Sequence, residues 1–427
     1  MEVSKAGDRR LVFTLQDITL MLFGFWPVWQ NIWVNLRISL LFMGDTAPLL
    51  VITGICFLLI LTNPVLKLDI CLLPWVILIV NIILTMLTQK AYRPVARHDV
   101  AHFICGILFL ACMGKDVVKK NMLVRITFVV GFFISATVLL DRAFGLFTVR
   151  LIGLYTDGAR SFMDGRLGGG IIPATGAAAL FVVSGLAAFL TQSRDGKSGI
   201  YAFRYSVTAS FIISLVALNK RSQILVPLAA VAVIWGLHFL WTERKETISV
   251  SFFLKILLAA VLIAVMAVFL YNKMPMFRTS VDSFLEKIQN DDGTLSGRTQ
   301  LFDLALRLFR QHPLTGVGWY RYRFYTVGVY NRFDPHTFLA HNCYLQVLSE
   351  MGLIGFGFFI LALLCPLFTS FRRYHLLLAG NGSKTDQVFC ELGIFFQLYF
   401  ILYCMSGNPL YDGSFVILYF IGIYLGL

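Results

Sequence analysis

Two segments of the chain carry side chains that could do chemistry: a histidine that could transfer a proton and an arginine that could bind an anion. His341 and Asn342 stand where a polar stretch re-enters an apolar run, and a histidine there can exchange a proton near neutral pH. Arg298 follows Ser296 and Gly297 in the first turn of an expected amphipathic helix. Because a positive charge opposes the helix dipole there, Arg298 indicates an anionic partner. The alternatives are a structural histidine and an arginine solvated at a frayed helix end.

A third basic segment, Lys220-Arg221-Ser222, ends one apolar run and begins the next, with no room for a loop. An arginine fixed at the mouth of two packed helices is costly unless it has a ligand or a partner. The guanidinium fork pairs in bidentate fashion with phosphate or carboxylate. Arg221 and Arg298 therefore indicate a site for an anion of that kind.

Residues 312–318 read His-Pro-Leu-Thr-Gly-Val-Gly, and Pro313 is expected to end the amphipathic helix. The two glycines permit a tight turn or a close backbone approach. A phosphate loop is a poor fit, because the segment lacks Lys-Ser/Thr and follows a helix. His336 and His341 have no Asp or Cys at ligand spacing, so the pattern does not favour a metal site.

Long apolar runs hold these segments in place. The chain of 427 residues is 58% hydrophobic and 14% charged, whereas soluble domains carry roughly 25% charged residues, which excludes a soluble enzyme. A spanning helix needs roughly 20 apolar residues, and by that rule the sequence predicts an all-α polytopic membrane protein with about twelve spans. The runs lie at 14–36, 47–62, 69–88, 100–113, 122–140, 171–191, 203–218, 223–241, 250–271, 353–371, 386–405 and 412–427. Pro27 and Gln30 interrupt the first run.

Three regions follow from this pattern. Residues 1–271 are expected to hold transmembrane helices 1–9, residues 272–352 a large and partly helical loop, and residues 353–427 helices 10–12. Two connections between the runs are long, one at 141–170 and one at 272–352. The positive charges in the short loops place the N-terminus inside the cell and both of these connections outside. No paired carboxylates for a nucleotide-sugar metal, and no Walker or Rossmann pattern, occur in the sequence.

The net charge of +13 divides between the two sides of the membrane. Positive residues on the inner side mix Lys and Arg, whereas those on the outer side are mostly Arg. Loop acids or lipid headgroups could pair with some of them, but the loops at 88–98 and 219–222 offer almost no acidic partner. The excess indicates an exterior anion site rather than a nucleic-acid surface. Further candidates for contact with the anion or an attached glycan are Arg93, Arg97, Arg142 and Lys220.

Together, the Ser-Gly-Arg run at 296–298 with its helix, the segment 312–318, and His341-Asn342-Cys343-Tyr344-Leu345 up to Gly352 resemble the signature of the bacterial O-antigen ligase and polymerase superfamily. The resemblance implies a GT-C glycosyltransferase of the inner membrane with its active site facing the periplasm and with no metal or cofactor. The implied donor is a glycan on undecaprenyl diphosphate. A ligase passes the glycan to a sugar hydroxyl of lipid A-core, and a polymerase passes it to a second lipid-linked glycan.

By motif, the resemblance implies catalytic roles for His341, Arg298 and Arg221 and substrate binding by Asn342. The segment around Arg221 departs from the Ser-Arg pattern of the family. We expect the arginines to stabilise charge on the leaving diphosphate and His341 to act as general base in one inverting displacement. A ligase is the first expectation and a polymerase the second. A lipid-linked glycan flippase or transporter is a third, which the long ordered loop and the lack of repeated halves disfavour.

Overall fold

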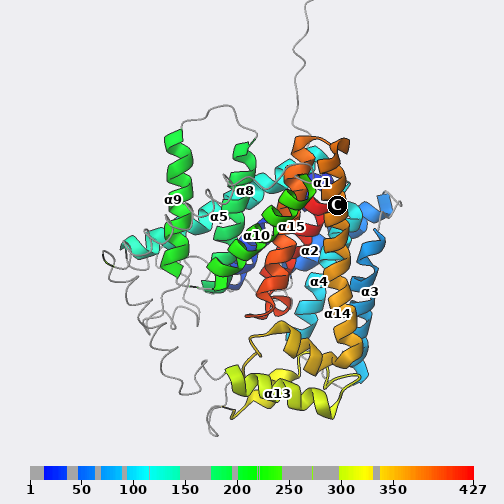
Figure 1. Cartoon of the computed structure of the whole chain (residues 1–427). Coiled ribbons are helices and arrows are strands. Elements are labelled where there is room, and N and C mark those ends of the chain that lie inside the picture. The colour runs from blue at the N-terminus through cyan, green and yellow to red at the C-terminus, as the bar shows by residue number, and fades with distance from the viewer. Residues whose placement is uncertain are drawn as a thin grey trace, which may run out of the picture.

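A computed structural model describes residues 14–35, 47–62, 69–88, 94–114, 116–144, 175–194, 201–218, 220, 222–242, 272, 298–329 and 337–427. Within these ranges the chain is helical and contains no strand (Figure 1). The helices are α1 (Leu15–Asn35), α2 (Ala47–Thr62), α3 (Leu73–Thr88), α4 (Pro94–Cys112), α5 (Val117–Phe144), α8 (Thr175–Arg194), α9 (Tyr201–Leu218), α10 (Ser222–Thr242), α13 (Arg298–Gln311), α14 (Cys343–Leu376), α15 (Lys384–Tyr403) and α16 (Gly413–Gly426). Short helical turns lie at Ile70–Leu72, Tyr322–Thr326, Leu377–Asn381 and Pro409–Tyr411.

The predicted apolar runs coincide with described helices, apart from the run at 250–271, which lies outside the described residues. Five of these helices are long and apolar enough to cross a membrane, and six shorter apolar helices accompany them. The all-helical prediction is therefore confirmed for this part of the chain, while the count of twelve spans stays a prediction. The expected interruption of the first run is not seen, because α1 continues through Pro27 to Asn35.

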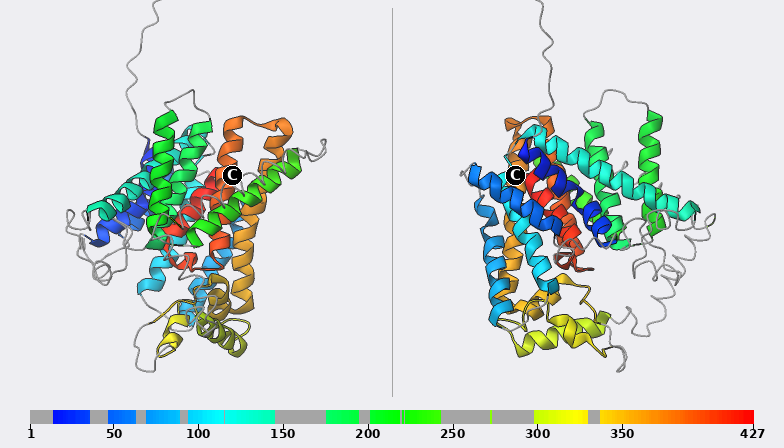
Figure 2. Two further views of the ribbon diagram at one scale, coloured as in Figure 1. Left: turned by 60° about the vertical axis from the view of Figure 1, so that its left-hand side comes forward. Right: turned by 180° about the vertical axis from the view of Figure 1, so that it is seen from behind.

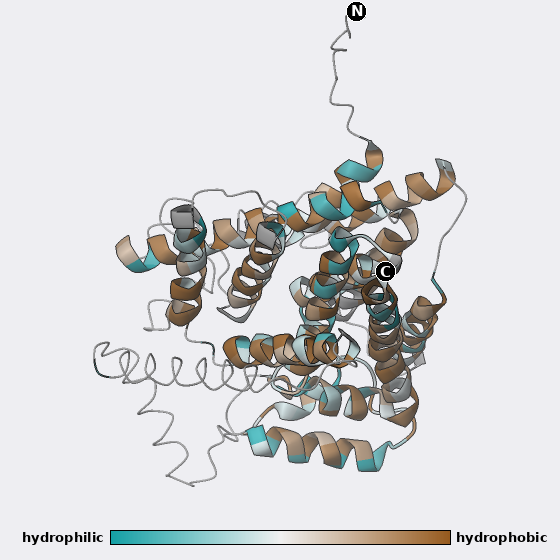
Figure 3. Cartoon of the chain, turned by 45° about the horizontal axis from the view of Figure 1, so that its top comes forward, coloured by the Kyte–Doolittle hydropathy of each residue, from teal (hydrophilic) through white to brown (hydrophobic). Residues whose placement is uncertain are grey.

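Large apolar side chains cover the outside of the bundle. On α10, Leu225 is 66% exposed and Trp235 is 67% exposed. The spanning helices are apolar over most of their length (Figure 3). Apolar surface of this extent is unfavourable in water but suits the hydrocarbon core of a bilayer. The chain is thus a multi-pass membrane protein.

Small residues let some of these helices approach closely. At the contact between α5 and α8, a Cβ atom built on Gly131 would lie 2.5 Å from the Cα of Gly185. At the contact between α15 and α16, a Cβ on Gly393 would lie 2.4 Å from the backbone nitrogen of Gly426. Helices in a membrane associate through such close packing, since lipid tails are as apolar as leucine.

The helix α14 links the two ends of the bundle. It rises beside α3 from the end where α13 lies, and it turns back into α15 at the opposite end (Figures 1 and 2). α14 also crosses the predicted boundary between loop and span at 352/353. Gly352 has φ 62° and ψ −165° and kinks the helix there. The residues that precede the kink therefore belong to the loop end of the molecule.

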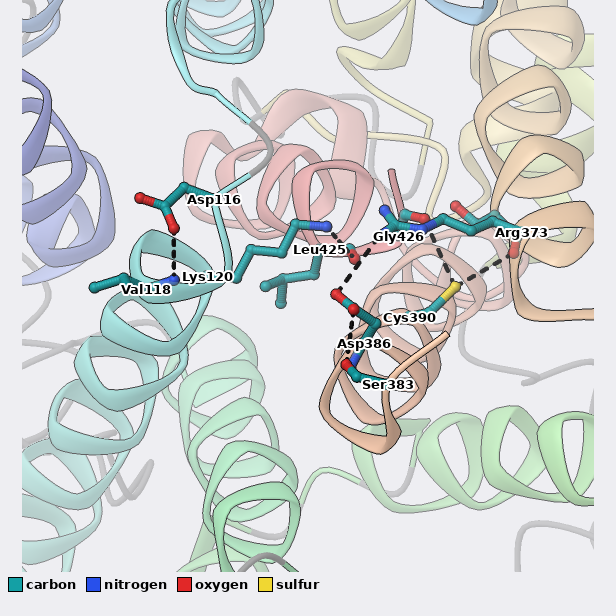
Figure 4. A network of polar contacts seen from close by, with 10 residues as sticks. Asp116, Val118, Lys120, Arg373, Ser383, Asp386, Cys390, Leu425 and Gly426 are labelled. Carbon is teal, nitrogen blue, oxygen red and sulfur yellow. Dashed lines mark hydrogen bonds and ion pairs between the residues drawn. The ribbon is translucent and has the colours of Figure 1, made fainter. Parts of the chain in front are cut away.

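Polar contacts fasten the end of the bundle that lies away from α13 (Figure 4). Lys120 of α5 is buried and donates from Nζ to the carbonyl of Leu425, 3.2 Å away. Arg373 and Asp386 form an ion pair of 3.8 Å between α14 and α15. A lysine suits the carbonyl-rich end of a helix, so Lys120 holds α16 in place by its last turn.

Candidate functional site

The loop that precedes α14 folds around a small apolar core of its own. The amphipathic helix α13 supplies Leu304, Ala305 and Leu308, which pack with Val317 and others of this segment. The hydroxyl of Tyr322 donates to the carbonyl of Leu301 at 2.7 Å. This packing fixes α13 in the loop and holds Arg298, its first residue, at a defined place. The helix ends at Gln311, as the position of Pro313 predicts.

The turn predicted at 312–318 is confirmed, and it docks on the kink of α14. The N–H groups of Val317 and Gly318 donate to the carbonyls of Ser349 (3.0 Å) and Glu350 (2.7 Å). In the other direction, the N–H of Leu353 donates to the carbonyl of Pro313 at 2.8 Å. These bonds use backbone groups that the kink frees from the helix, so the loop and α14 are joined as one unit.

Two glycines make this contact possible. Gly316 has φ 66°, and a Cβ built on it would lie 2.3 Å from the carbonyl carbon of Glu350. Gly352 has φ 62°, and its Cβ would lie 2.3 Å from the carbonyl carbon of Leu314. Both positions lie in the left-handed region and both press against backbone, which only glycine tolerates.

A fully buried carboxylate lies beneath this contact. Glu350 Oε2 accepts from the N–H of Tyr320 at 2.8 Å and from the hydroxyl of Tyr411 at 2.7 Å. Glu350 Oε1 accepts from the N–H of Tyr322 at 3.1 Å and from Nε2 of Gln346 at 3.3 Å. Four donors converge on one side chain, so Glu350 ties the loop, α14 and the turn before α16 together.

His341 sits between two anchored neighbours. The N–H of Ala340 donates to Gln346 Oε1 at 3.0 Å, and the N–H of Cys343 donates to the carbonyl of Cys404 at 2.8 Å. Asn342 accepts from the N–H of Leu345 at 3.1 Å and forms the N-cap of α14. His341 itself has φ 55°, a strained conformation for a histidine. The hydrogen bonds of the neighbouring residues maintain this backbone conformation and fix the point from which the imidazole side chain extends.

Arg298 and Lys220 both lie within electrostatic range of His341, although the three residues are far apart in sequence. His341 keeps part of its side chain exposed. Partial burial lowers the pKa of His341 below its usual value, and the positive charges of Arg298 and Lys220 lower it further. The lowered pKa favours the neutral imidazole, which can accept a proton, within electrostatic range of two cations suited to an anion.

Polar groups of the membrane helices extend this cluster. Gln223, at the start of α10, is 1% exposed, and its Oε1 accepts a hydrogen bond from the hydroxyl of Tyr399. Tyr403 lies within electrostatic range of Arg298 and of the half-buried Asp412. Burial raises the pKa of Asp412, and its side chain caps α16 through the N–H of Ser414.

The other predicted residues are placed as follows. Arg142, in the last turn of α5, donates to the carbonyl of Ala217 near the end of α9, so it joins two helices three residues before Lys220. Arg97 lies in α4, and its side chain is outside the described part of the structure. Arg93 and Arg221 lie outside the described residues.

One arginine of the loop before α14, Arg323, bonds hydroxyl groups rather than the loop acids or lipid headgroups of the alternative interpretation. Arg323 donates from Nε and Nη2 to the hydroxyl of Thr337, at 3.0 and 2.7 Å. It also donates from Nη1 to the hydroxyl of Tyr320 at 2.5 Å. Arg323 therefore positions the chain that leads to His341.

Comparison with known families gives this arrangement a context. Residues 179–360 match the model of the O-antigen ligase family. This region runs from α8 into α14 and includes Lys220, Arg298 and His341. Over these residues the match confirms the resemblance drawn from the motifs. No curated protein sequence matches the chain.

Several residues near the cluster were missed from the sequence. Gln223 and Tyr403 lie within apolar runs and carry no charge, so their types gave no signal. Glu350 did carry a signal in the sequence, because a carboxylate at the start of an apolar run must find hydrogen-bond donors if it is buried. Glu350 lies two residues before Gly352, and this spacing could have indicated the kink.

Proposed function

We propose that this chain is an O-antigen ligase-type glycosyltransferase that moves a glycan from undecaprenyl diphosphate to a sugar hydroxyl of lipid A-core. The reaction takes place at the periplasmic face of the inner membrane and needs no metal. The observation that carries the proposal is the placement of His341 within electrostatic range of Arg298 and Lys220, whose charges lower the pKa of its imidazole. The family match supports an enzyme of the ligase or polymerase type.

The chemistry is one displacement at the anomeric carbon. His341 takes the proton from the acceptor hydroxyl while that oxygen attacks the anomeric carbon. The bond from this carbon to the diphosphate oxygen breaks, and the lipid diphosphate leaves with the electron pair. Arg298 and Arg221 are assigned to the growing negative charge on the diphosphate, and Lys220 joins them from its place in the cluster. Attack from the side opposite the leaving group inverts the anomeric configuration.

The purified full-length protein, given lipid-linked glycan and lipid A-core, tests the catalytic roles. His341→Ala is expected to lower transfer by about 10²–10⁴-fold, the usual contribution of a general base. Arg298→Ala is expected to lower it by about 10²–10³-fold through lost charge stabilisation. Arg310→Ala, an exposed change in the last turn of the same helix, is the matched control and should transfer normally. Near-normal transfer by His341→Ala would sink the assignment.

A polymerase with the same donor is the second candidate, since both reactions need the same cluster. Deletion of the gene followed by gel analysis of lipopolysaccharide distinguishes them. A ligase leaves lipid A-core without any O-antigen ladder while lipid-linked polymer accumulates. A polymerase leaves core that carries a single repeat unit. Transfer by purified protein without any gradient excludes a pure flippase or transporter.

A further inference from the structure

A largely apolar cavity of about 520 Å³ lies within the membrane part of the molecule. Helices α8, α9, α10 and α15 form its walls, with side chains such as Leu186, Leu215 and Phe395. Gln223, Thr191 and Glu391 interrupt this apolar lining. Gln223 is of particular interest, because it is almost completely buried and stands at the start of α10.

The amide of Gln223 is oriented by its own hydrogen bond. Its Oε1 accepts from the hydroxyl of Tyr399, which leaves Nε2 as the donor end of the amide. Nε2 is buried and has no acceptor at ordinary hydrogen-bond geometry among the described residues, and the hydroxyl of Tyr403 lies within its longer reach. A buried donor without an acceptor is unfavourable, and proteins rarely keep one except where a ligand or water meets it.

Gln223 also borders the cationic cluster. Its N–H donates to the carbonyl of Lys220 at 3.0 Å, so the two residues share one turn. A Cβ built on Gly176 would lie 3.6 Å from the hydroxyl of Tyr403 and 4.0 Å from Nε2 of Gln223. Tyr403 in turn lies within electrostatic range of Arg298. The amide thus stands where the apolar cavity meets the groups assigned to the diphosphate.

We propose that Gln223 is a substrate-binding residue, whose Nε2 donates a hydrogen bond to a phosphate oxygen of a polyprenyl diphosphate with its hydrocarbon chain in the cavity. This inference rests on the proposed function, because it takes the donor lipid as the occupant. A lipid diphosphate combines the two features that the place requires, an apolar chain and an anionic oxygen at one end. Gln223 then sets the depth at which the diphosphate stops beside Lys220.

Steady-state kinetics of the full-length protein test this role. Gln223→Leu keeps the side-chain bulk but removes the donor, and it should raise the KM for lipid-linked glycan roughly tenfold or more, the loss expected for one hydrogen bond to a charged group. The kcat and the KM for the acceptor should stay within about twofold of wild type. Tyr399→Phe removes the hydroxyl that orients the amide and should give a smaller rise in the same KM. Thr62→Val, an exposed change on α2 outside the cavity lining, is the control and should leave the KM unchanged.

Two results would overturn the inference: an unchanged donor KM in Gln223→Leu, or a fall in kcat alone. A binding measurement keeps it separate from the proposed function. Native mass spectrometry with glycan-free polyprenyl diphosphate should show binding to wild type and weaker binding to Gln223→Leu, even if wild type transfers no glycan. In that case the proposed function fails and the lipid site stands. Equal competition by phosphatidylglycerol would show a bilayer-lipid site and overturn the assignment to polyprenyl diphosphate.

Discussion

His341 is a titratable group whose protonation is influenced by its neighbours. Partial burial and the charges of Arg298 and Lys220 hold its pKa below the ordinary value of about 6.5. The lowered pKa favours the neutral form that a general base needs at pH 7. It also has a cost for the fold. As the pH falls below the unfolded value, the unfolded chain binds this proton before the folded chain does, so His341 destabilises the fold in that window.

The pH dependence of glycan transfer should report this shift. With substrates well below saturation, kcat/KM reports the free enzyme and should fall on the acid side with an apparent pKa below about 6.5. Lys220→Gln removes one of the two positive neighbours, so the acid limb should move to higher pH. Lys384→Gln is the control, since Lys384 begins α15 at the opposite end of the bundle. An acid limb above the ordinary histidine value, or one that Lys220→Gln does not move, would contradict the role of His341.

At the residue scale, the sequence singled out the charged residues of the proposed site more readily than the neutral ones. Arg298 and His341 stand out because a charge in a first helical turn and an imidazole at a span boundary are unusual. Their closeness to each other could not be predicted, since the segment between them reverses direction in a turn. Gln223 was missed because a glutamine in an apolar run is compatible with simple packing.

Among the elements, the interlock of the 312–318 turn with the α14 kink is the most constrained. Both Gly316 and Gly352 have positive φ, and each meets the backbone of the other segment. The two glycines of the motif predicted a close approach, but the partner surface could not be known. The kink that receives the turn is itself a tertiary feature, because an isolated helix would have continued through Gly352.

Gly316→Ala tests the interlock. The substitution forces an alanine into left-handed φ and against the carbonyl of Glu350, at a cost of about 1–3 kcal/mol for the backbone strain alone. We expect a lower melting temperature and faster amide exchange over 312–318. Gly357→Ala is the control, because Gly357 lies on α14 and an added Cβ would meet nothing within 4 Å. This substitution should be neutral or slightly stabilising. Equal effects of the two changes would show that the contact contributes nothing.

On the scale of the whole molecule, the two ends of the bundle differ in what they carry. The end with α13 holds His341 and Arg298, and the end with the α14–α15 turn holds Lys120, Arg373 and Lys384 (Figures 1 and 4). The proposed orientation puts the first end in the periplasm. Hydropathy predicted the helices well, because apolar composition and length decide which segments can span. It could not predict how the loop before α14 folds, since that depends on contacts with α14 itself.

Cysteine labelling tests this orientation. Arg310 and Lys384 are exposed and lie near opposite ends of the bundle. In spheroplasts, a membrane-impermeant maleimide should label Arg310→Cys at once and Lys384→Cys only after lysis. The parent chain sets the background, because most of its free cysteines are buried. Labelling of Lys384→Cys from outside would reverse the assigned topology.

The backbone hydrogen bonds between 313–318 and 349–354 also define which segment must be transferred as one piece when parts of related proteins are combined. A graft of only the polar loop from a relative would separate Gly316 from the kink that receives it, and a graft of only the helix would do the reverse. A functional hybrid must therefore move α13, the turn and the first part of α14 in one piece. In evolutionary terms, we expect this block to change only as a whole.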